Sequence, residues 1–330
     1  MKYYRLIGIL IPLILSCQKS STHQLGGPVF GTTYQITYQG SSPDQLQVEQ
    51  ALDAIYDSLN NSMSTYIPNS LISQFNRAQD SLQIDFHFQK VYQLSQTVWK
   101  NSQGAFDPTV GPLVEAYGFG SKEGINNLSD AQIDSLKQLV GFEKLKLNSA
   151  GWLFKQAPNM ALDFNAVAKG YAVDVVADWF EAQEVENYLI EIGGEIRARG
   201  RSPKSNKPWR IAIDDPKQEK YRAFIQTLDL GTGAMATSGN YRKFRIDSIT
   251  GAYYVHTIDP KTAKPALSTI LSVSVLAPRC SVADAWATAL MVLPLEKGQQ
   301  LIEEDSSLEA LWIVAEGDQL LQIPSQGWNK

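Results

Sequence analysis

The sequence predicts an α+β fold in which mixed or antiparallel sheets are flanked by helices. From residue 144 onward, short strand-like runs are broken by only two convincing helices, so strand and helix do not alternate regularly. The glycine pattern of a Rossmann dinucleotide site is also absent, because Gly193-Gly194 follows a strand but nothing completes the fingerprint. These observations argue against a doubly wound parallel sheet.

Composition places the chain among ordinary globular proteins. With 330 residues, 44% of them hydrophobic and 19% charged, it can bury a large core as one domain or two closely packed ones. The formal charge is −5, with acidic and basic residues interspersed. Because no basic face emerges that could neutralise a run of phosphates, a nucleic acid is not an expected partner.

The N-terminus predicts export and a lipid anchor. Lys2 and Arg5 precede an apolar run over residues 6–15, which is far short of the ~20 residues that a membrane-spanning helix needs. The run ends in Ser16-Cys17, which resembles a bacterial lipobox, so residues 1–17 are expected to form a signal peptide that ends at a lipidated Cys17. The alternative is an ordinary signal peptide with an incidental cysteine.

Residues 18–28 predict a flexible tether, because they are polar and end in Gly-Gly-Pro, and residues 29–330 are expected to form the folded domain. With Cys17 lipidated, Cys280 is the one cysteine left, so no intramolecular disulfide can form. The expected location is the bacterial cell envelope, lipid-anchored and facing the periplasm.

Alternation and helical spacing predict the following elements in chain order. A strand is expected over 31–38, a helix through Leu46 to Met63, and a second helix over 88–99. Further strands are expected over 144–147, 188–192, 209–213, 224–228, 253–258, 270–276 and 310–315.

The alanine-rich segment over 281–290 follows a predicted strand and is expected to be helical. Asp284 and Thr288 lie four residues apart, so a helix places both on one face. A carboxylate and a hydroxyl are hard oxygen donors of the kind that Mg²⁺ prefers. Ser281 and Asp284 also have the spacing of a capping box, in which Asp284 would only stabilise the helix start. Spacing alone leaves both interpretations open.

Residues 162–171 carry polar groups around the expected start of another helix. Asp163, Asn165 and Lys169 lie there, and the helix-start amides with Lys169 could hold an anionic group. In the alternative, Asp163 or Asn165 is an ordinary cap and Lys169 is solvated.

His256 lies at the end of a predicted strand, just before a turn. An imidazole, with an ordinary pKa of about 6.5, can accept a proton from an attacking hydroxyl at neutral pH. A purely structural histidine is the alternative.

Taken together, these segments resemble the ApbE family of FAD:protein FMN transferases over nearly all of residues 29–330. The resemblance rests on eight segments in the family's order. They are FGTTYQITY, STYIPNSLISQFN, GAFDPTVGPLVEAYGFG, LDFNAVAKGYAVD, IEIGGEIRARG, MATSGNYRKF, HTIDP and ADAWATAL.

The resemblance implies a set of site residues. Asp284, Thr288 and the backbone carbonyl of Ala166 would bind Mg²⁺, and His256 would be the general base. The FAD site would be lined by Phe30, Tyr66, Tyr117, Gly118, Phe119, Asp163, Lys169 and Ile258. Two positions depart from the family pattern: Phe30 replaces a methionine, and Asn165-Ala166 stands where many members have Gly-Gly or Ser-Thr.

The resemblance also implies the reaction. FMN would be transferred from FAD to a Thr or Ser hydroxyl of an acceptor flavoprotein, with Mg²⁺ assisting and AMP leaving. The acceptor would be a subunit of a membrane-bound electron-transport complex. The alternatives are an FAD pyrophosphatase that gives FMN and AMP, and a flavin-binding lipoprotein without catalysis.

Overall fold

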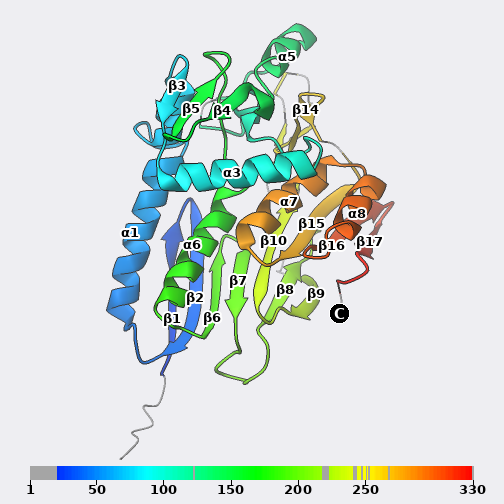
Figure 1. The fold of residues 1–330 in the computed structure, drawn as a ribbon. Coiled ribbons are helices and arrows are strands. Elements are labelled where there is room, and N and C mark those ends of the chain that lie inside the picture. Colours follow the sequence, from blue (N-terminus) through cyan, green and yellow to red (C-terminus); the bar gives the residue numbers. More distant parts are fainter. Residues whose placement is uncertain are drawn as a thin grey trace, which may run out of the picture.

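The computed structural model describes residues 21–328, except residues 122, 218–222, 241–243, 247, 250, 252 and 267. An eight-stranded sheet forms its centre (Figure 1). In spatial order the strands are β1 (Ser21–Val29), β2 (Thr32–Gly40), β6 (Asn187–Ile192), β7 (Glu195–Arg199), β10 (Gly233–Gly239), β15 (Ile270–Ala277), β16 (Glu309–Glu316) and β17 (Gln319–Pro324). Neighbouring strands are antiparallel, which confirms the α+β architecture.

Helices α6 (Ala168–Ala182) and α7 (Cys280–Val292) cover one face of this sheet, with α1 (Gln45–Met63) and α3 (Phe86–Asn101) beside them (Figure 1). Helix α6 approaches α7 closely at Gly170, where an added Cβ would lie 2.5 Å from the Cys280 carbonyl oxygen. The small residues of α7 allow this approach, and Ala283, Ala285, Ala287 and Ala289 are all fully buried. The main core therefore lies between the sheet and these helices.

The other face of the sheet is covered by the hairpin of β8 (Arg210–Asp214) and β9 (Phe224–Asp229). Strand β16 shows how both faces are used, because Trp312 packs in the main core while Leu311 and Ile313 pack in a second cluster with Met235 and Trp328. A strand buried on both faces reads as a continuous apolar run, as the segment over 310–315 does.

A smaller layer lies beyond α3, at the top of Figure 1. Its sheet has the order β3 (Ser81–Gln83), β5 (Trp152–Lys155) and β4 (Leu145–Leu147). The remaining described elements are α2 (Leu71–Arg77), α4 (Gly111–Ala116), α5 (Asp130–Lys137), α8 (Leu295–Glu303), the 3₁₀ turns Pro108–Val110 and Phe142–Lys144, and the pairs β11 (Phe244–Ile246) with β12 (Tyr253–Val255) and β13 (Ile258–Asp259) with β14 (Lys264–Pro265).

The expected flexible tether over 18–28 is wrong for residues 21–28. Strand β1 pairs along its whole length with β2, from Ser21 opposite Gly40 to Val29 opposite Thr32. Backbone hydrogen bonds to β2 order this polar segment, and an edge strand tolerates its proline at Pro28. Residues 1–20, with the predicted signal peptide and Cys17, lie outside the described residues. Within the described part of the chain, no helix has the length and apolar character needed to cross a membrane.

Candidate active site

The start of α7 is held by a carboxylate of α6. Asp174, which is fully buried, accepts hydrogen bonds from the Cys280 amide at 3.0 Å, the Ser281 amide at 2.9 Å and the Ser281 hydroxyl at 2.6 Å. Helix α7 thus begins before Ser281, with Arg279 at its N-cap. The capping-box interpretation of Asp284 is therefore wrong, because Asp284 lies inside the helix and is 3% exposed.

Asp284 instead contacts the start of α6. Its Oδ2 accepts a hydrogen bond of 2.9 Å from the Gly170 amide. The sequence predicted that this helix start could hold an anion, and the anion found there is a carboxylate of the chain itself. Asp163 does not cap α6, because its Oδ1 accepts from the Asn165 amide at 2.7 Å, ahead of the helix.

The same hydrogen bond bears on Ala166. In a regular helix the Gly170 amide would donate to the carbonyl four residues earlier, which is that of Ala166. Because this amide donates to Asp284, no backbone amide of the described residues donates to the Ala166 carbonyl. A main-chain oxygen is thereby left available near a buried carboxylate.

Thr288 follows Asp284 by one helical turn and contacts the end of β10. Its Oγ1 lies 3.1 Å from the Ser238 Oγ. Two residues along, the Asn240 Oδ1 accepts a hydrogen bond of 2.9 Å from the Thr257 hydroxyl. The end of β10 therefore connects α7 with the segment that carries His256 and Ile258.

The Asp284 carboxylate, the Thr288 hydroxyl and the Ala166 carbonyl, which the sequence predicted as metal ligands, are hard oxygen donors of the kind that Mg²⁺ prefers. Among the residues that the structure describes, no group of three or more His, Cys, Asp or Glu side chains is arranged to bind a metal. A cation site here would have mixed donors with one carboxylate, which suits Mg²⁺ because it usually keeps several waters and binds substrate phosphates.

Lys169 is part of a charged cluster and is not the solvated side chain of the alternative interpretation. Its Nζ lies 3.0 Å from the Glu195 Oε1, and the two side chains are 31% and 4% exposed. We call Lys169, Glu195 and Asp284 the Lys169 cluster. Burial opposes the lysine charge, but the Glu195 and Asp284 carboxylates outweigh it and raise the pKa of Lys169.

The two carboxyl groups of the Lys169 cluster are poorly solvated. Burial raises the pKa of Glu195 to about 7, against the opposing charge of Lys169. Burial likewise raises the pKa of Asp284, although Lys169 and the Gly170 amide favour its ionised form. A cation beside Asp284 would relieve this cost, since opposite charge favours the ionised carboxylate.

A second group of predicted residues gathers around α4. The Tyr117 ring is 2% exposed, and its hydroxyl donates to the Ala263 carbonyl at 3.1 Å. Ile258 packs in the same small core. Phe119 meets His256 edge to face, with ring centroids 6.4 Å apart, after Gly118 turns the chain at a φ of +80°. The structure thus brings Tyr117, Gly118 and Phe119 together with His256 and Ile258.

Tyr66 is 60% exposed. Partial burial and then the charges of Asp163 and Glu115 raise the pKa of Tyr66. Asp163 belongs to the loop that leads through Ala166 to α6, so the charge of this loop acts on the Tyr66 hydroxyl.

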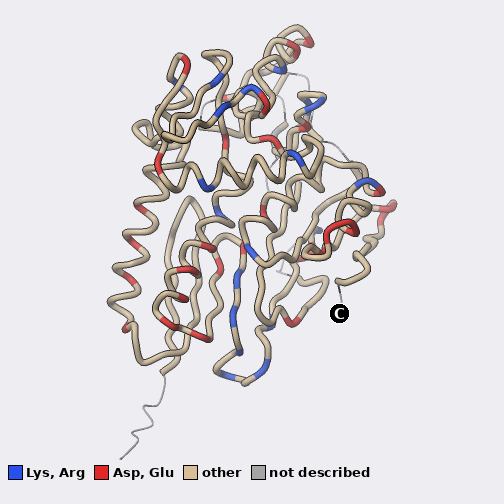
Figure 2. The backbone as a smooth tube through the Cα atoms, viewed as in Figure 1, with Lys and Arg blue, Asp and Glu red and all other residues tan. Residues whose placement is uncertain are grey.

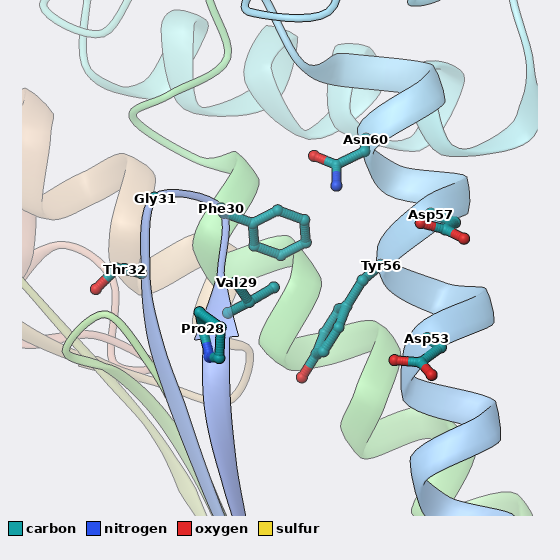
Figure 3. A pocket seen from close by; sticks show the side chains of 9 residues that line it. All are labelled: Pro28, Val29, Phe30, Gly31, Thr32, Asp53, Tyr56, Asp57 and Asn60. Atoms are coloured by element: carbon teal, nitrogen blue, oxygen red, sulfur yellow. The ribbon is translucent and has the colours of Figure 1, made fainter.

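Phe30 lies at the tip of the β1–β2 hairpin. Phe30 and Gly31 have φ values of +49° and +73°, which a two-residue hairpin turn requires. The Phe30 ring points toward α1 and meets Tyr56 edge to face at 5.4 Å, whereas Thr32 points to the opposite side (Figure 3). Phe30 thereby faces an open hollow of about 760 Å³, which is lined by Pro28, Val29, Phe30, Gly31, Thr32, Asp53, Tyr56, Asp57 and Asn60.

The hairpin tip also borders the Lys169 cluster. An added Cβ on Gly193 would lie 2.8 Å from Thr32 Cγ2 and 3.4 Å from the Glu195 Oε2, so Thr32 and Glu195 flank the same turn. Acidic positions follow α1, two of which, Asp53 and Asp57, line the hollow, and basic positions follow β7 (Figure 2). The hollow and the charged cluster therefore meet at the hairpin.

The sequence did not single out Glu195, Asp174 or Ser238. The sequence did contain a signal for Glu195. It is a charged residue at the first position of a strand, directly after Gly193-Gly194, and this position is buried. Asp174 and Ser238 had no such signal, since the residues of α7 that they contact lie 50 or more residues away along the chain.

Comparison with known proteins gives one consistent result. The model of a family described as the ApbE family matches residues 30–312. The chain is 35% identical over 323 residues to a FAD:protein FMN transferase of Vibrio cholerae, covering 96% of this chain and 95% of the relative. It is 34% identical over 313 residues to a protein of the same name from Haemophilus influenzae, covering 91% and 90%.

Solved structures agree. The fold matches the flavin transferase ApbE from Vibrio cholerae with a TM-score of 0.83 and 33% identity, covering 94% of this chain and 98% of that one. It matches the apo form of the Pseudomonas stutzeri flavinyl transferase ApbE with a TM-score of 0.84 and 32% identity, covering 94% and 97%.

Proposed function

This chain belongs to the ApbE family, and we propose from that membership and from its site that it is a magnesium-dependent FAD:protein FMN transferase. The enzyme would split FAD, attach the FMN half to a Thr or Ser hydroxyl of an acceptor flavoprotein, and release AMP. The single observation that supports this most is the 2.9 Å hydrogen bond between the Gly170 amide and the Asp284 carboxylate. It joins the two distant segments whose oxygens would hold the cation.

The metal would be held by Asp284, Thr288 and the Ala166 carbonyl. When bound, Mg²⁺ would draw charge off the oxygens of the FAD diphosphate during attack. Lys169 would add a fixed positive charge beside it, and Ser238 would orient the Thr288 hydroxyl through their 3.1 Å contact. These contacts support a site that is built before the substrate arrives.

The remaining site residues would bind FAD and move a proton. Phe30, Tyr66, Tyr117, Phe119 and Ile258 supply aromatic and apolar surface suited to the flavin and adenine rings. His256 would accept the proton of the acceptor hydroxyl at its ring nitrogen as that oxygen attacks phosphorus. Its place against Phe119 supports this role, because Phe119 belongs to the expected FAD site.

We further propose that Cys17 is lipidated and that the enzyme works at the bacterial cell envelope, facing the periplasm. The acceptor would be a subunit of a membrane-bound electron-transport complex. Confinement to the same membrane would raise the local concentration of enzyme and acceptor.

Incubation of the purified chain with FAD, Mg²⁺ and an acceptor domain tests the reaction. We expect flavin fluorescence on the acceptor in a denaturing gel and one AMP released per label. AMP without labelling would indicate an FAD pyrophosphatase, and bound but intact FAD would indicate a flavin-binding lipoprotein. Excess EDTA should abolish AMP release, and activity that survives EDTA would rule out the metal.

His256→Ala isolates the proposed base. We expect labelling to fall by about 10²-fold or more, because a positioned base contributes on that order. FAD binding, measured by quenching of flavin fluorescence, should remain close to that of the unaltered chain. Transfer at the normal rate would show that another group accepts the proton.

A further inference from the structure

Glu195 has a buried carboxylate of which one oxygen forms an ion pair. Its Oε1 lies 3.0 Å from the Lys169 Nζ. Its Oε2 is buried and has no hydrogen-bond partner among the described residues. Burying a charge in this way costs free energy that one ion pair rarely repays, so stability alone does not account for Glu195.

The surroundings of Glu195 are shaped to hold it. Gly193 and Gly194 turn the chain directly before it, with φ values of +62° and +102°. A side chain at Gly193 would lie 2.8 Å from Thr32 Cγ2, so the turn has room for glycine alone. The Glu195 carboxylate is thereby held beside Thr32 of the β1–β2 hairpin, while the side chain of Lys169, with which it pairs, remains 31% exposed.

Lys169 experiences two carboxylates, since the charges of Glu195 and of Asp284 both act on it. A lysine side chain is long and flexible, so without Glu195 its ammonium would pair with the remaining carboxylate. That carboxylate is Asp284, which also carries the proposed metal site. An ammonium seated on Asp284 would repel a divalent cation and occupy its oxygens.

We propose that Glu195 is a positioning residue that holds the Lys169 ammonium away from the Asp284 carboxylate and so keeps Asp284 available for the divalent cation. The inference rests on the proposed function, because it assigns the cation to Asp284. It explains why a carboxylate with one ion pair and one unpartnered oxygen among the described residues is buried beside the site. The ion pair with Glu195 also fixes the direction of the Lys169 ammonium, so that its other N–H groups can donate to an anionic substrate.

Calorimetric titration of the full chain with Mg²⁺ alone, without FAD, tests the proposal. Glu195→Ala should weaken Mg²⁺ binding by about 10-fold or more, the usual effect of losing a group that orients a metal ligand. Adding Lys169→Met should restore the affinity to that of Lys169→Met alone, because the competing ammonium is gone. A role in folding alone would not be rescued in this way.

Controls separate the outcomes. Glu195→Gln preserves the shape of the side chain and should give a smaller loss, so the test does not depend on Glu195→Ala being well folded. Glu181→Gln removes another carboxylate that pairs with a basic side chain, that of Arg197 at 2.9 Å, and should leave Mg²⁺ affinity unchanged. Unchanged affinity in both Glu195 variants, or a double variant no better than Glu195→Ala, would overturn the proposal while leaving the proposed function intact. A starting chain that does not bind Mg²⁺ would overturn both.

Discussion

Each of the helices α6 and α7 has a buried carboxylate that accepts hydrogen bonds from the start of the other helix. These are Asp174 on α6 and Asp284 on α7, and they differ in how many partners they have. Asp174 accepts from the Cys280 amide and from the Ser281 amide and hydroxyl. It also pairs with Arg197 at 2.9 Å and with Arg279 at 3.3 Å. We call Asp174, Arg197 and Arg279 the Asp174 cluster.

Asp284 lies one turn along α7 from the Ser281 that Asp174 holds. Within the described part of the chain it accepts one hydrogen bond, from the Gly170 amide, and it lies within reach of the Lys169 charge. Buried polar groups in native proteins are normally paired, so an under-satisfied one calls for an explanation. The contrast indicates that the Asp174 cluster builds the helix pair and that the Lys169 cluster is prepared for a ligand. The same pair of helices thus carries a structural carboxylate and one that we propose to be functional.

The largest expected effect is on activity at Asp284. Asp284→Ala should lower AMP release by about 10³-fold, because a metal ion contributes several kcal/mol to the barrier and this change removes its one carboxylate ligand. The midpoint of urea unfolding at pH 7 should not fall, because burial raises the pKa of Asp284 and its loss removes a poorly solvated charge. Normal AMP release by this variant would show that Asp284 is not needed for the reaction.

Asp174→Ala should have the opposite profile. Loss of Asp174 leaves Arg197 without its most buried acceptor and two helix-start amides unpaired, so we expect destabilisation of about 3–5 kcal/mol in urea unfolding. The variant should still bind Mg²⁺ wherever it remains folded. An unfolding free energy like that of the unaltered chain would show that the Asp174 cluster is not structural.

Asp107 extends the comparison, because it accepts from three donors but forms no ion pair with a Lys or Arg of the described residues. It accepts from the Thr109 amide and hydroxyl and from the Phe142 amide, yet burial raises the pKa of Asp107 to about 6 from 3.8. The folded chain therefore retains a proton that the unfolded chain releases. This contribution to stability is present below pH 3.8 and is lost as pH rises through about 6.

The size of that contribution follows from the shift, which corresponds to about 3 kcal/mol. Asp107→Asn should remove this pH dependence from the unfolding free energy measured between pH 4 and 7, relative to the exposed control Asp134→Asn. An identical pH slope in both variants would show that hydrogen bonds alone keep Asp107 ionised.

The smallest expected effect concerns the orientation of Thr288. Ser238→Ala removes the 3.1 Å contact to the Thr288 hydroxyl and should weaken Mg²⁺ binding by about 10-fold. Thr237→Val, which removes the 2.8 Å contact between Thr237 of β10 and Ser274 of β15, is the matched control and should leave Mg²⁺ affinity unchanged. Equal behaviour of the two variants would show that Ser238 does not support the metal.

The large sheet and its helices could be predicted in outline, because β-branched runs and helical spacing are local signals. The runs over 188–192, 270–276 and 310–315 all became strands of the large sheet. The run over 253–258 did not, since it divides into Tyr253–Val255 and Ile258–Asp259. Strand β1 was missed because its residues are polar and only its pairing with β2 orders them.

The candidate site was predictable where its residues share an element, as Asp284 and Thr288 do on α7. Their convergence with Lys169 and Ala166 was an expectation from family resemblance, and the Gly170–Asp284 contact supports it. The role of Glu195 was not predicted, because its ion pair with Lys169 joins strand β7 to helix α6. No spacing rule relates residues on two different elements. Spacing reveals a shared face, whereas ion pairs between elements depend on the packed fold.

The early start of β1 bears on how far the enzyme could reach from a membrane under the proposal that Cys17 is lipidated. Ser21 follows Cys17 by four residues, so a lipid on Cys17 would hold the body within ~14 Å of the membrane interface. Nine residues of β1 then carry the chain ~30 Å to the hairpin at Phe30. With the proposed lipid on Cys17, the hairpin could therefore stand at most ~44 Å above the bilayer, which limits the height at which an acceptor hydroxyl could be modified.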